Sequence, residues 1–126
     1  MNIAHRICPD LKTYADAQKF CETAAMNGFT TGRLVEPRTQ SFNDNVFAES
    51  LVVFGYPSWI GINVRKGPPW VYTSGGNELV FENWYPFEPT DKALTYCISW
   101  NKINGRVGKW LDYHCNTKLH FVCEFV

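Results

Sequence analysis

Five cysteines, at positions 8, 21, 97, 115 and 123, constrain this 126-residue chain more than any other feature of its sequence. No two of them form a CxxC pair, so neither a zinc ribbon nor a thioredoxin-like redox site is indicated. Cysteines this far apart along a chain are typical of structural disulfides, which form in an oxidising compartment. We therefore expect a secreted, extracellular protein held together by disulfides.

The length and composition suit one globular domain, which we expect to span residues 1–126. Hydrophobic residues make up 45% of the chain and aromatic residues 16%, enough for a sizeable core. Twelve Lys and Arg balance twelve Asp and Glu without a long basic run, so nothing favours nucleic acid as a partner. No apolar stretch is long enough to span a membrane. Residues 1–10 lack the apolar core of a signal peptide, and we interpret the chain as a mature form.

Helical periodicity is confined to the first half of the chain. Thr13, followed three residues later by Asp16, predicts a helix start, and helical spacing continues to a stop at Gly28. A second helix is expected over residues 41–51. Strands are expected over 34–35, 59–62, 70–73, 96–100, 109–113 and 120–125, with an irregular loop over 85–94. Asn104-Gly105 is a strong hairpin signal. Helices followed by short strands predict an α+β fold.

Several short motifs in a fixed order carry a resemblance to a known family. They are Tyr14–Cys21 (YADAQKFC), Trp59–Ile62 (WIGI), Asn83-Trp84, Glu88-Pro89-Thr90, Cys97, Trp110-Leu111-Asp112, Cys115 and Phe121–Phe125 (FVCEF). On these motifs the chain resembles the C-type lectin-like domain over nearly its whole length, and most of all the small soluble invertebrate C-type lectins. The resemblance implies two helices, short antiparallel sheets and a long irregular loop region. It also places the tryptophans at 59, 84 and 110 in the core.

The resemblance further implies two disulfides, Cys21 with Cys123 and Cys97 with Cys115. Cys8 is then left over, because the N-terminal cysteine pair of longer family members is represented here by a single residue. An unpaired cysteine near a chain end of a secreted protein often links two subunits. We expect an interchain disulfide through Cys8 and hence a dimer; the alternative is a free or capped thiol.

Calcium binding is expected to be weak or absent. In sugar-binding members the calcium is held by an EPN or QPD triplet, an acidic residue before the third cysteine, and an Asn-Asp pair after a Trp. The corresponding positions here are Glu88-Pro89-Thr90, Thr95 and Leu111-Asp112, so only Glu88 and Asp112 remain of the five side chains. Calcium takes about six to eight oxygen ligands. We therefore expect no cofactor.

Without the metal, we expect a sugar to bind through direct hydrogen bonds. The candidate carbohydrate-binding residues are Phe87, Glu88, Thr90, Asp91, Lys92, Thr95, Asp112 and Tyr113. Carboxylates accept hydrogen bonds from sugar hydroxyls and from an acetamido N–H, and the two aromatic rings offer an apolar wall. This set predicts an N-acetylated sugar, GlcNAc or GalNAc. An ordinary solvated role for Glu88 or Asp112 is an equally good interpretation of either residue alone. The resemblance also implies a cis peptide bond before Pro89.

Other functions fit the sequence less well. A calcium-independent protein-binding module is the alternative, because many family members without calcium ligands serve that role and fold does not fix function. Glycosidases also use paired carboxylates, but nothing marks Glu88 or Asp112 as a raised-pKa acid, so we do not expect an enzyme. The three histidines lack a metal-binding spacing. By analogy with the family, we expect glycan recognition in innate immunity, with the dimer supplying avidity.

Overall fold

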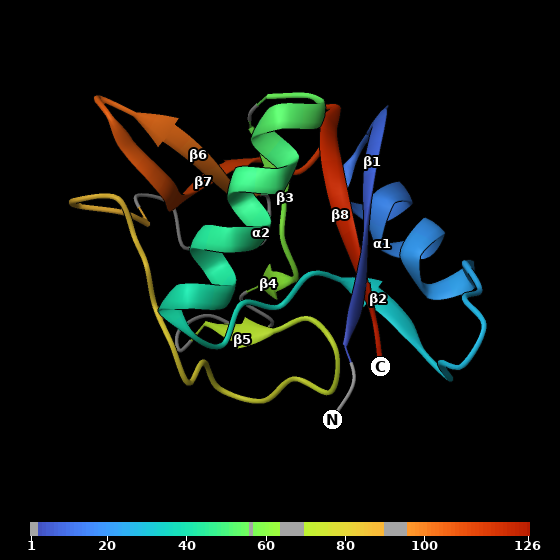
Figure 1. The fold of residues 1–126 in the computed structure, drawn as a ribbon. Coiled ribbons are helices and arrows are strands. Elements are labelled where there is room, and N and C mark those ends of the chain that lie inside the picture. Colours follow the sequence, from blue (N-terminus) through green and yellow to red (C-terminus); the bar gives the residue numbers. More distant parts are fainter. Residues whose placement is uncertain (1–2, 56, 64–69, 90–95) are drawn as a thin grey trace.

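The computed structural model describes residues 3–55, 57–63, 70–89 and 96–126 (Figure 1). In chain order its elements are β1 (Ala4–Lys12), α1 (Tyr14–Thr23), β2 (Gly32–Leu34), α2 (Gln40–Val53), β3 (Ser58–Trp59), β4 (Ile62–Asn63), β5 (Val71–Tyr72), β6 (Tyr96–Ile103), β7 (Arg106–His114) and β8 (Leu119–Phe125). Two helices and two sheets confirm the expected α+β fold.

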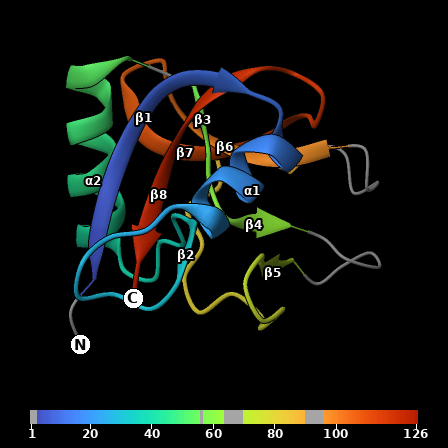
Figure 2. The same ribbon diagram turned by 90° about the vertical axis from the view of Figure 1, so that its right-hand side faces the viewer.

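One sheet joins the two ends of the chain. Its strand order is β1-β8-β3-β6-β7, and β2 also pairs with β8. Strands β1 and β8 run antiparallel with Arg6 opposite Cys123, so the first and last strands lie side by side (Figure 2). Strand β1 was not predicted, because it carries Pro9 and charged residues and buries only Cys8. Such a pattern is typical of an edge strand, which needs no regular apolar face.

The first helix begins where the sequence predicts and ends earlier. The Thr13 hydroxyl accepts a hydrogen bond from the Asp16 amide at 3.4 Å, as an N-cap does. The helix then stops at Thr23, because Ala24 takes an extended conformation. Gly28 lies beyond it with a φ of 88°, so the glycine marks the following turn and not the helix end. The second helix has the predicted position but is longer by one residue at its start and two at its end.

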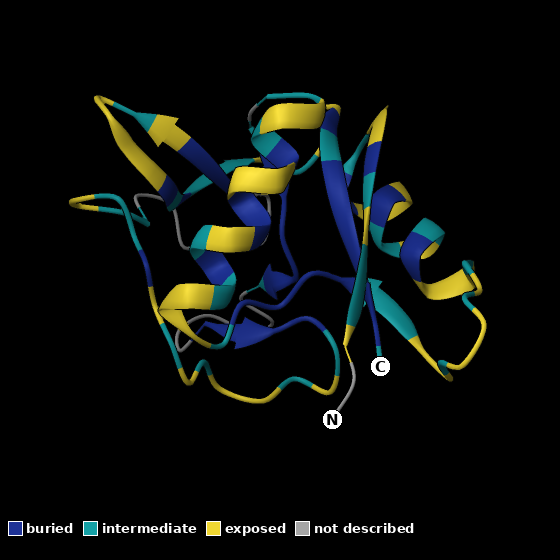
Figure 3. Ribbon diagram, in the orientation of Figure 1, coloured by how far each residue is buried: buried dark blue, intermediate teal, exposed yellow. Residues whose placement is uncertain are grey.

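The apolar side chains form one core beneath α2 and another beneath α1 (Figure 3). Trp100 and Trp110 lie in the first core and Trp59 in the second, and all three are fully buried. The predicted strand over 59–62 is divided between β3 and β4 at Ile60-Gly61. A Cβ atom on Gly61 would lie 2.7 Å from the Leu34 carbonyl oxygen, so only glycine fits this close approach.

Both disulfides implied by the family resemblance are confirmed, Cys21–Cys123 and Cys97–Cys115. The second joins the start of β6 to the residue that follows β7 and so closes the base of the β6–β7 hairpin. Cys8 is a free thiol that is only 5% exposed, and burial raises its pKa. The interchain disulfide stays a prediction, and the Cys8 sulfur would have to become exposed to reach a partner chain.

Candidate functional site

The β6–β7 hairpin forms the frame of the candidate site. Ile103 pairs with Arg106 across its tip, and Asn104 and Gly105 take φ values of 51° and 77°. Positive φ at both central residues is what the favoured two-residue hairpin turn requires, and Asn-Gly meets that requirement at low cost. The hairpin turn predicted from these two residues is therefore confirmed.

Residues 83–85, which lead into the irregular loop, are anchored on the outer edge of β7. The Trp110 amide donates to the Asn83 carbonyl oxygen at 2.9 Å, and the Tyr85 amide donates to the Trp110 carbonyl oxygen at 2.9 Å. The Asn83 side-chain amide also donates to the carbonyl oxygen of Gly108 at 2.7 Å. These bonds fix the position from which the chain enters the candidate loop.

Helix α2 reaches the same carbonyl group through a buried side chain that the sequence did not identify. Asn43 is fully buried; its Nδ2 donates to the Gly108 oxygen at 3.0 Å, and its Oδ1 accepts from Trp110 Nε1 at 2.8 Å. Gly108 has a φ of 65°, and a Cβ atom there would lie 2.7 Å from Asn43 Nδ2. A polar residue on the buried face of α2, beside Val46 and Phe47, is the only sequence signal for this network.

The loop itself begins with a turn that exposes an aromatic ring. The Glu88 amide donates to the Tyr85 carbonyl oxygen at 2.9 Å, and the Glu88–Pro89 peptide bond is cis, as the resemblance implies. Within this turn Phe87 has a φ of 69°, which a bulky residue seldom adopts, and its side chain is 96% exposed. Backbone conformations of this kind gather at binding sites.

The structure brings some of the predicted site residues together. Asp112 lies on β7 two residues beyond Trp110, about 7 Å along the strand from the anchor of the 85–88 turn. Tyr113 does not share its face, because neighbouring residues of a strand point to opposite sides of the sheet. The Tyr113 hydroxyl accepts from Asn101 Nδ2 at 3.2 Å, and its ring packs against the core under α1. Thr90, Asp91, Lys92 and Thr95 lie outside the described residues.

The described part of the chain holds no group of three or more His, Cys, Asp or Glu side chains that could bind a metal. Leu111, at the position where the family resemblance places an amide ligand, has no side-chain oxygen. The histidines have other contacts: His5 bonds Glu49 at 2.6 Å, and His120 stacks on Phe54 with ring centroids 4.4 Å apart.

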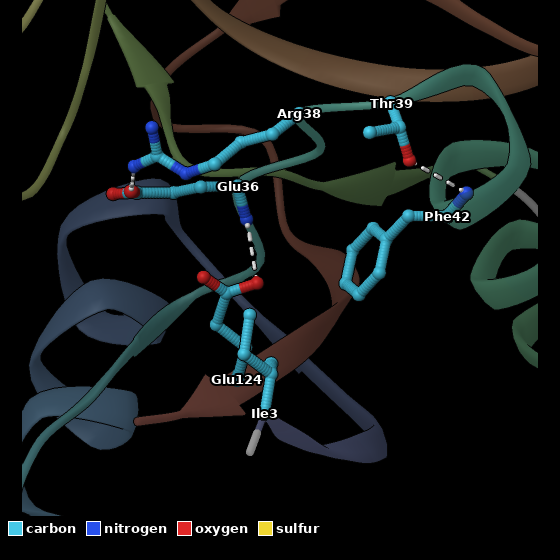
Figure 4. A pocket seen from close by; sticks show the side chains of 6 residues that line it. All are labelled: Ile3, Glu36, Arg38, Thr39, Phe42 and Glu124. Atoms are coloured by element: carbon cyan, nitrogen blue, oxygen red, sulfur yellow. Dashed lines mark hydrogen bonds and ion pairs between the residues drawn. The ribbon is translucent and has the colours of Figure 1, made fainter. Parts of the chain in front are cut away.

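A separate cavity lies beside both ends of the chain. Its lining residues are Ile3, Glu36, Arg38, Thr39, Phe42 and Glu124 (Figure 4). Glu36 and Glu124 are almost fully buried, but Glu36 pairs with Arg38 at 2.9 Å and Glu124 pairs with Arg33 at 2.6 Å. Burial raises the pKa of Glu124, and the nearby Arg33 charge opposes that change. We interpret this cluster as an internal tie between β8 and the β2–α2 connection.

Comparison with known proteins decides the family. A family profile described as Lectin C-type domain matches residues 10–125. The chain belongs to this family. It is a C-type lectin-like domain, and its family comprises binding proteins and not enzymes. None of the helices in the described ranges is long and apolar enough to cross a membrane.

Individual relatives agree with this assignment. Lithostathine of Rattus norvegicus is 29% identical over 119 residues, covering 92% of this chain and 68% of lithostathine. Some relatives are much longer than this chain, which covers 4% of the secretory phospholipase A2 receptor of Mus musculus. The C-type lectin CEL-I from Cucumaria echinata shares the fold with a TM-score of 0.84 at 15% identity, covering 100% of this chain and 91% of CEL-I. An SPL-1–GlcNAc complex does so with a TM-score of 0.79 at 21% identity, covering 97% and 86%.

Proposed function

We propose that this domain is a secreted lectin that binds N-acetylated hexosamines, GlcNAc or GalNAc, without calcium. The observation that carries the proposal is the 85–88 turn, which holds the Phe87 ring in solvent directly beside Glu88. An acetamido group offers a methyl group that packs on an aromatic face and an N–H that donates to a carboxylate. That SPL-1 has been solved with GlcNAc supports the choice of sugar.

Calcium independence rests on the identity of the residues at the family's ligand positions. Thr90, Thr95 and Leu111 stand where amide or acidic oxygens are expected, and a threonine hydroxyl is a neutral, poorer ligand. Two carboxylates, Glu88 and Asp112, are too few for a tight site of six to eight oxygens. Direct hydrogen bonds from sugar to protein therefore replace coordination in the proposed mechanism.

Within the proposed site, the Phe87 ring forms the apolar wall for the sugar. Tyr113 lies on the other face of β7 and packs against the core under α1. Asp112 accepts hydrogen bonds from sugar hydroxyls on the face where Trp110 also lies. Asp91 and Lys92 complete the proposed polar set together with the two threonines at 90 and 95. The predicted affinity for a monosaccharide is weak, because little area is buried and association itself is costly.

Avidity would come from a dimer linked through Cys8, which we propose with one condition. The Cys8 thiol is 5% exposed, so the sulfur must become exposed before it can join a partner chain. Non-reducing electrophoresis tests this directly: the proposal requires a dimer band that disappears in Cys8→Ser. A monomer band in the oxidised wild-type protein would remove the dimer and leave the sugar site unaffected.

Protein binding is the alternative function. Val52 and Val53, in the last turn of α2, are 88% and 56% exposed, and adjacent exposed valines favour a surface that contacts another protein. The discriminating observation is whether a monosaccharide binds at all.

Variants of the 85–88 turn test the proposed site. In NMR titrations with GlcNAc, Phe87→Ala should weaken binding up to about tenfold, the value of one aromatic contact. Glu88→Gln should weaken it by a similar factor, because a charge-assisted acceptor is lost. Val80→Ala is the matched control, since Val80 is also an exposed apolar residue (71%) outside the turn. Binding that is unchanged in Phe87→Ala and Glu88→Gln would place the sugar elsewhere.

A further inference from the structure

The β6–β7 hairpin carries a charge pattern that the proposed sugar contacts do not use. Its two strands contain Lys102, Arg106 and Lys109, and the one acidic residue on them, Asp112, lies at the end away from the turn. Over the described ranges, the basic side chains found in ion pairs are those of His5, Arg33 and Arg38, all outside this hairpin. The hairpin therefore presents positive charge that no described carboxylate neutralises.

Two of these basic residues, Lys102 and Arg106, flank the turn at an exposed tip. Lys102 adjoins Ile103, which pairs with Arg106 across the turn, so the two basic residues flank the same turn. Both are exposed, and the tip stands away from the body of the domain (Figures 1 and 3). Lys109 lies further down the strand, where its Nζ donates to Asn83 Oδ1 at 3.1 Å.

One aromatic residue holds this tip in a defined position. The Tyr85 hydroxyl accepts from Asn104 Nδ2 at 2.9 Å, and the Arg106 guanidinium carbon lies 5.9 Å from the centre of the Tyr85 ring. A guanidinium group over an aromatic face is attracted to it and keeps its outer N–H groups available. Tyr85 thus orients Arg106 and joins the tip to the turn that contains Phe87.

We propose that the tip of the β6–β7 hairpin is a subsite for the anionic groups of an acidic glycan. Arg106 binds a sulfate or carboxylate group through its planar fork of N–H donors, and Lys102 contributes a second positive charge. The subsite extends the proposed sugar site, and the idea that one glycan contacts both the hairpin tip and the loop rests on the proposed function. Arg106 and Asp112 are six residues apart on one strand, about 20 Å. A ligand that contacts both ends is therefore an oligosaccharide.

Calorimetric titration of the full chain with three oligoanions tests this subsite. The ligands are a sulfated heparin oligosaccharide, a hyaluronan oligosaccharide that carries only carboxylates, and a polyglutamate peptide. The sulfated or the carboxylated sugar should bind, more weakly at high salt, and whichever binds identifies the anionic group. Lys102→Gln and Arg106→Gln should each weaken that binding about tenfold, the effect of one charged hydrogen bond. Lys118→Gln, an exposed lysine in the turn before β8, is the matched control and should change nothing.

The outcomes separate this inference from the proposed function. Lys102→Gln and Arg106→Gln should retain GlcNAc binding, whereas Phe87→Ala should weaken GlcNAc binding and retain binding of the anionic sugar. Binding of the anionic sugar without binding of GlcNAc would support the hairpin subsite and would refute only the proposed GlcNAc site in the loop. The inference is wrong if neither glycan binds, if Lys118→Gln weakens binding as much as Arg106→Gln, or if polyglutamate binds as tightly as the sugars.

Discussion

Replacing Asn43 with alanine should destabilise the domain more than any single change on the exposed face of α2. The Asn43 side chain is fully buried and bonds Trp110 Nε1 at 2.8 Å and the Gly108 oxygen at 3.0 Å. Alanine would leave the indole N–H without a partner, because Trp110 is itself fully buried. The Gly108 oxygen would keep the hydrogen bond from Asn83, so only one buried polar group is orphaned.

The expected loss follows from these contacts. An unsatisfied buried donor costs about 1–3 kcal/mol, and the lost bond to Gly108 adds about 1 kcal/mol. The free energy of unfolding should therefore fall by about 2–4 kcal/mol, a large part of the ~5–15 kcal/mol that is typical of a domain.

Urea unfolding followed by tryptophan fluorescence, with the disulfides intact, measures this loss. Asn45→Ala is the matched control, because Asn45 is an exposed residue of the same helix and should change stability by less than about 0.5 kcal/mol. An unchanged slope with a lower midpoint would show that stability itself has changed. A loss below about 1 kcal/mol for Asn43→Ala would show that the Trp110 indole N–H is not left unsatisfied without Asn43.

Three further predictions concern stability. Gly108→Ala should lower the free energy of unfolding by more than about 1–2 kcal/mol, because it adds a clash with Asn43 to the strain of a φ of 65°. This loss should be smaller in an Asn43→Ala background, and a double-mutant cycle by urea unfolding would measure the difference. Replacing Cys97 and Cys115 with serine should lower the free energy of unfolding by about 3 kcal/mol, because the disulfide closes a loop with a sequence separation of 18 residues. An unchanged urea midpoint would contradict this loop-entropy estimate. Burial raises the pKa of Glu124 above 4.5, so the folded state retains this proton to higher pH. The wild type should accordingly lose stability relative to Glu124→Gln as pH rises from about 4 to 7, and urea titrations showing the opposite trend would contradict the raised pKa.

Local signals in the sequence predicted much of the fold because their physical causes are local. The Thr13 cap and the Asn104-Gly105 turn each depend on a few neighbouring residues, and both appear where expected. Strand β1 was missed because it is held by pairing with β8, more than a hundred residues away, and shows no apolar alternation of its own.

The candidate site was predicted less completely, for two different reasons. The role of Asn43 could not be found, because its partners Gly108 and Trp110 lie 65 and 67 residues further along the chain. The separation of Tyr113 from Asp112 could have been found, because strand alternation alone puts adjacent residues on opposite faces. The family motifs indicated the part of β7 around Asp112, and the pleat of the strand decides which side chains there share a face.

Titration of the purified domain with GlcNAc and GalNAc, first with calcium and again with excess EDTA, tests calcium-independent sugar binding. We expect weak binding with the same dissociation constant in both buffers, because in the proposed site Glu88 and Asp112 accept hydrogen bonds from the sugar itself. Binding that disappears in EDTA would contradict it and would mean that these two carboxylates still recruit calcium despite Thr90, Thr95 and Leu111.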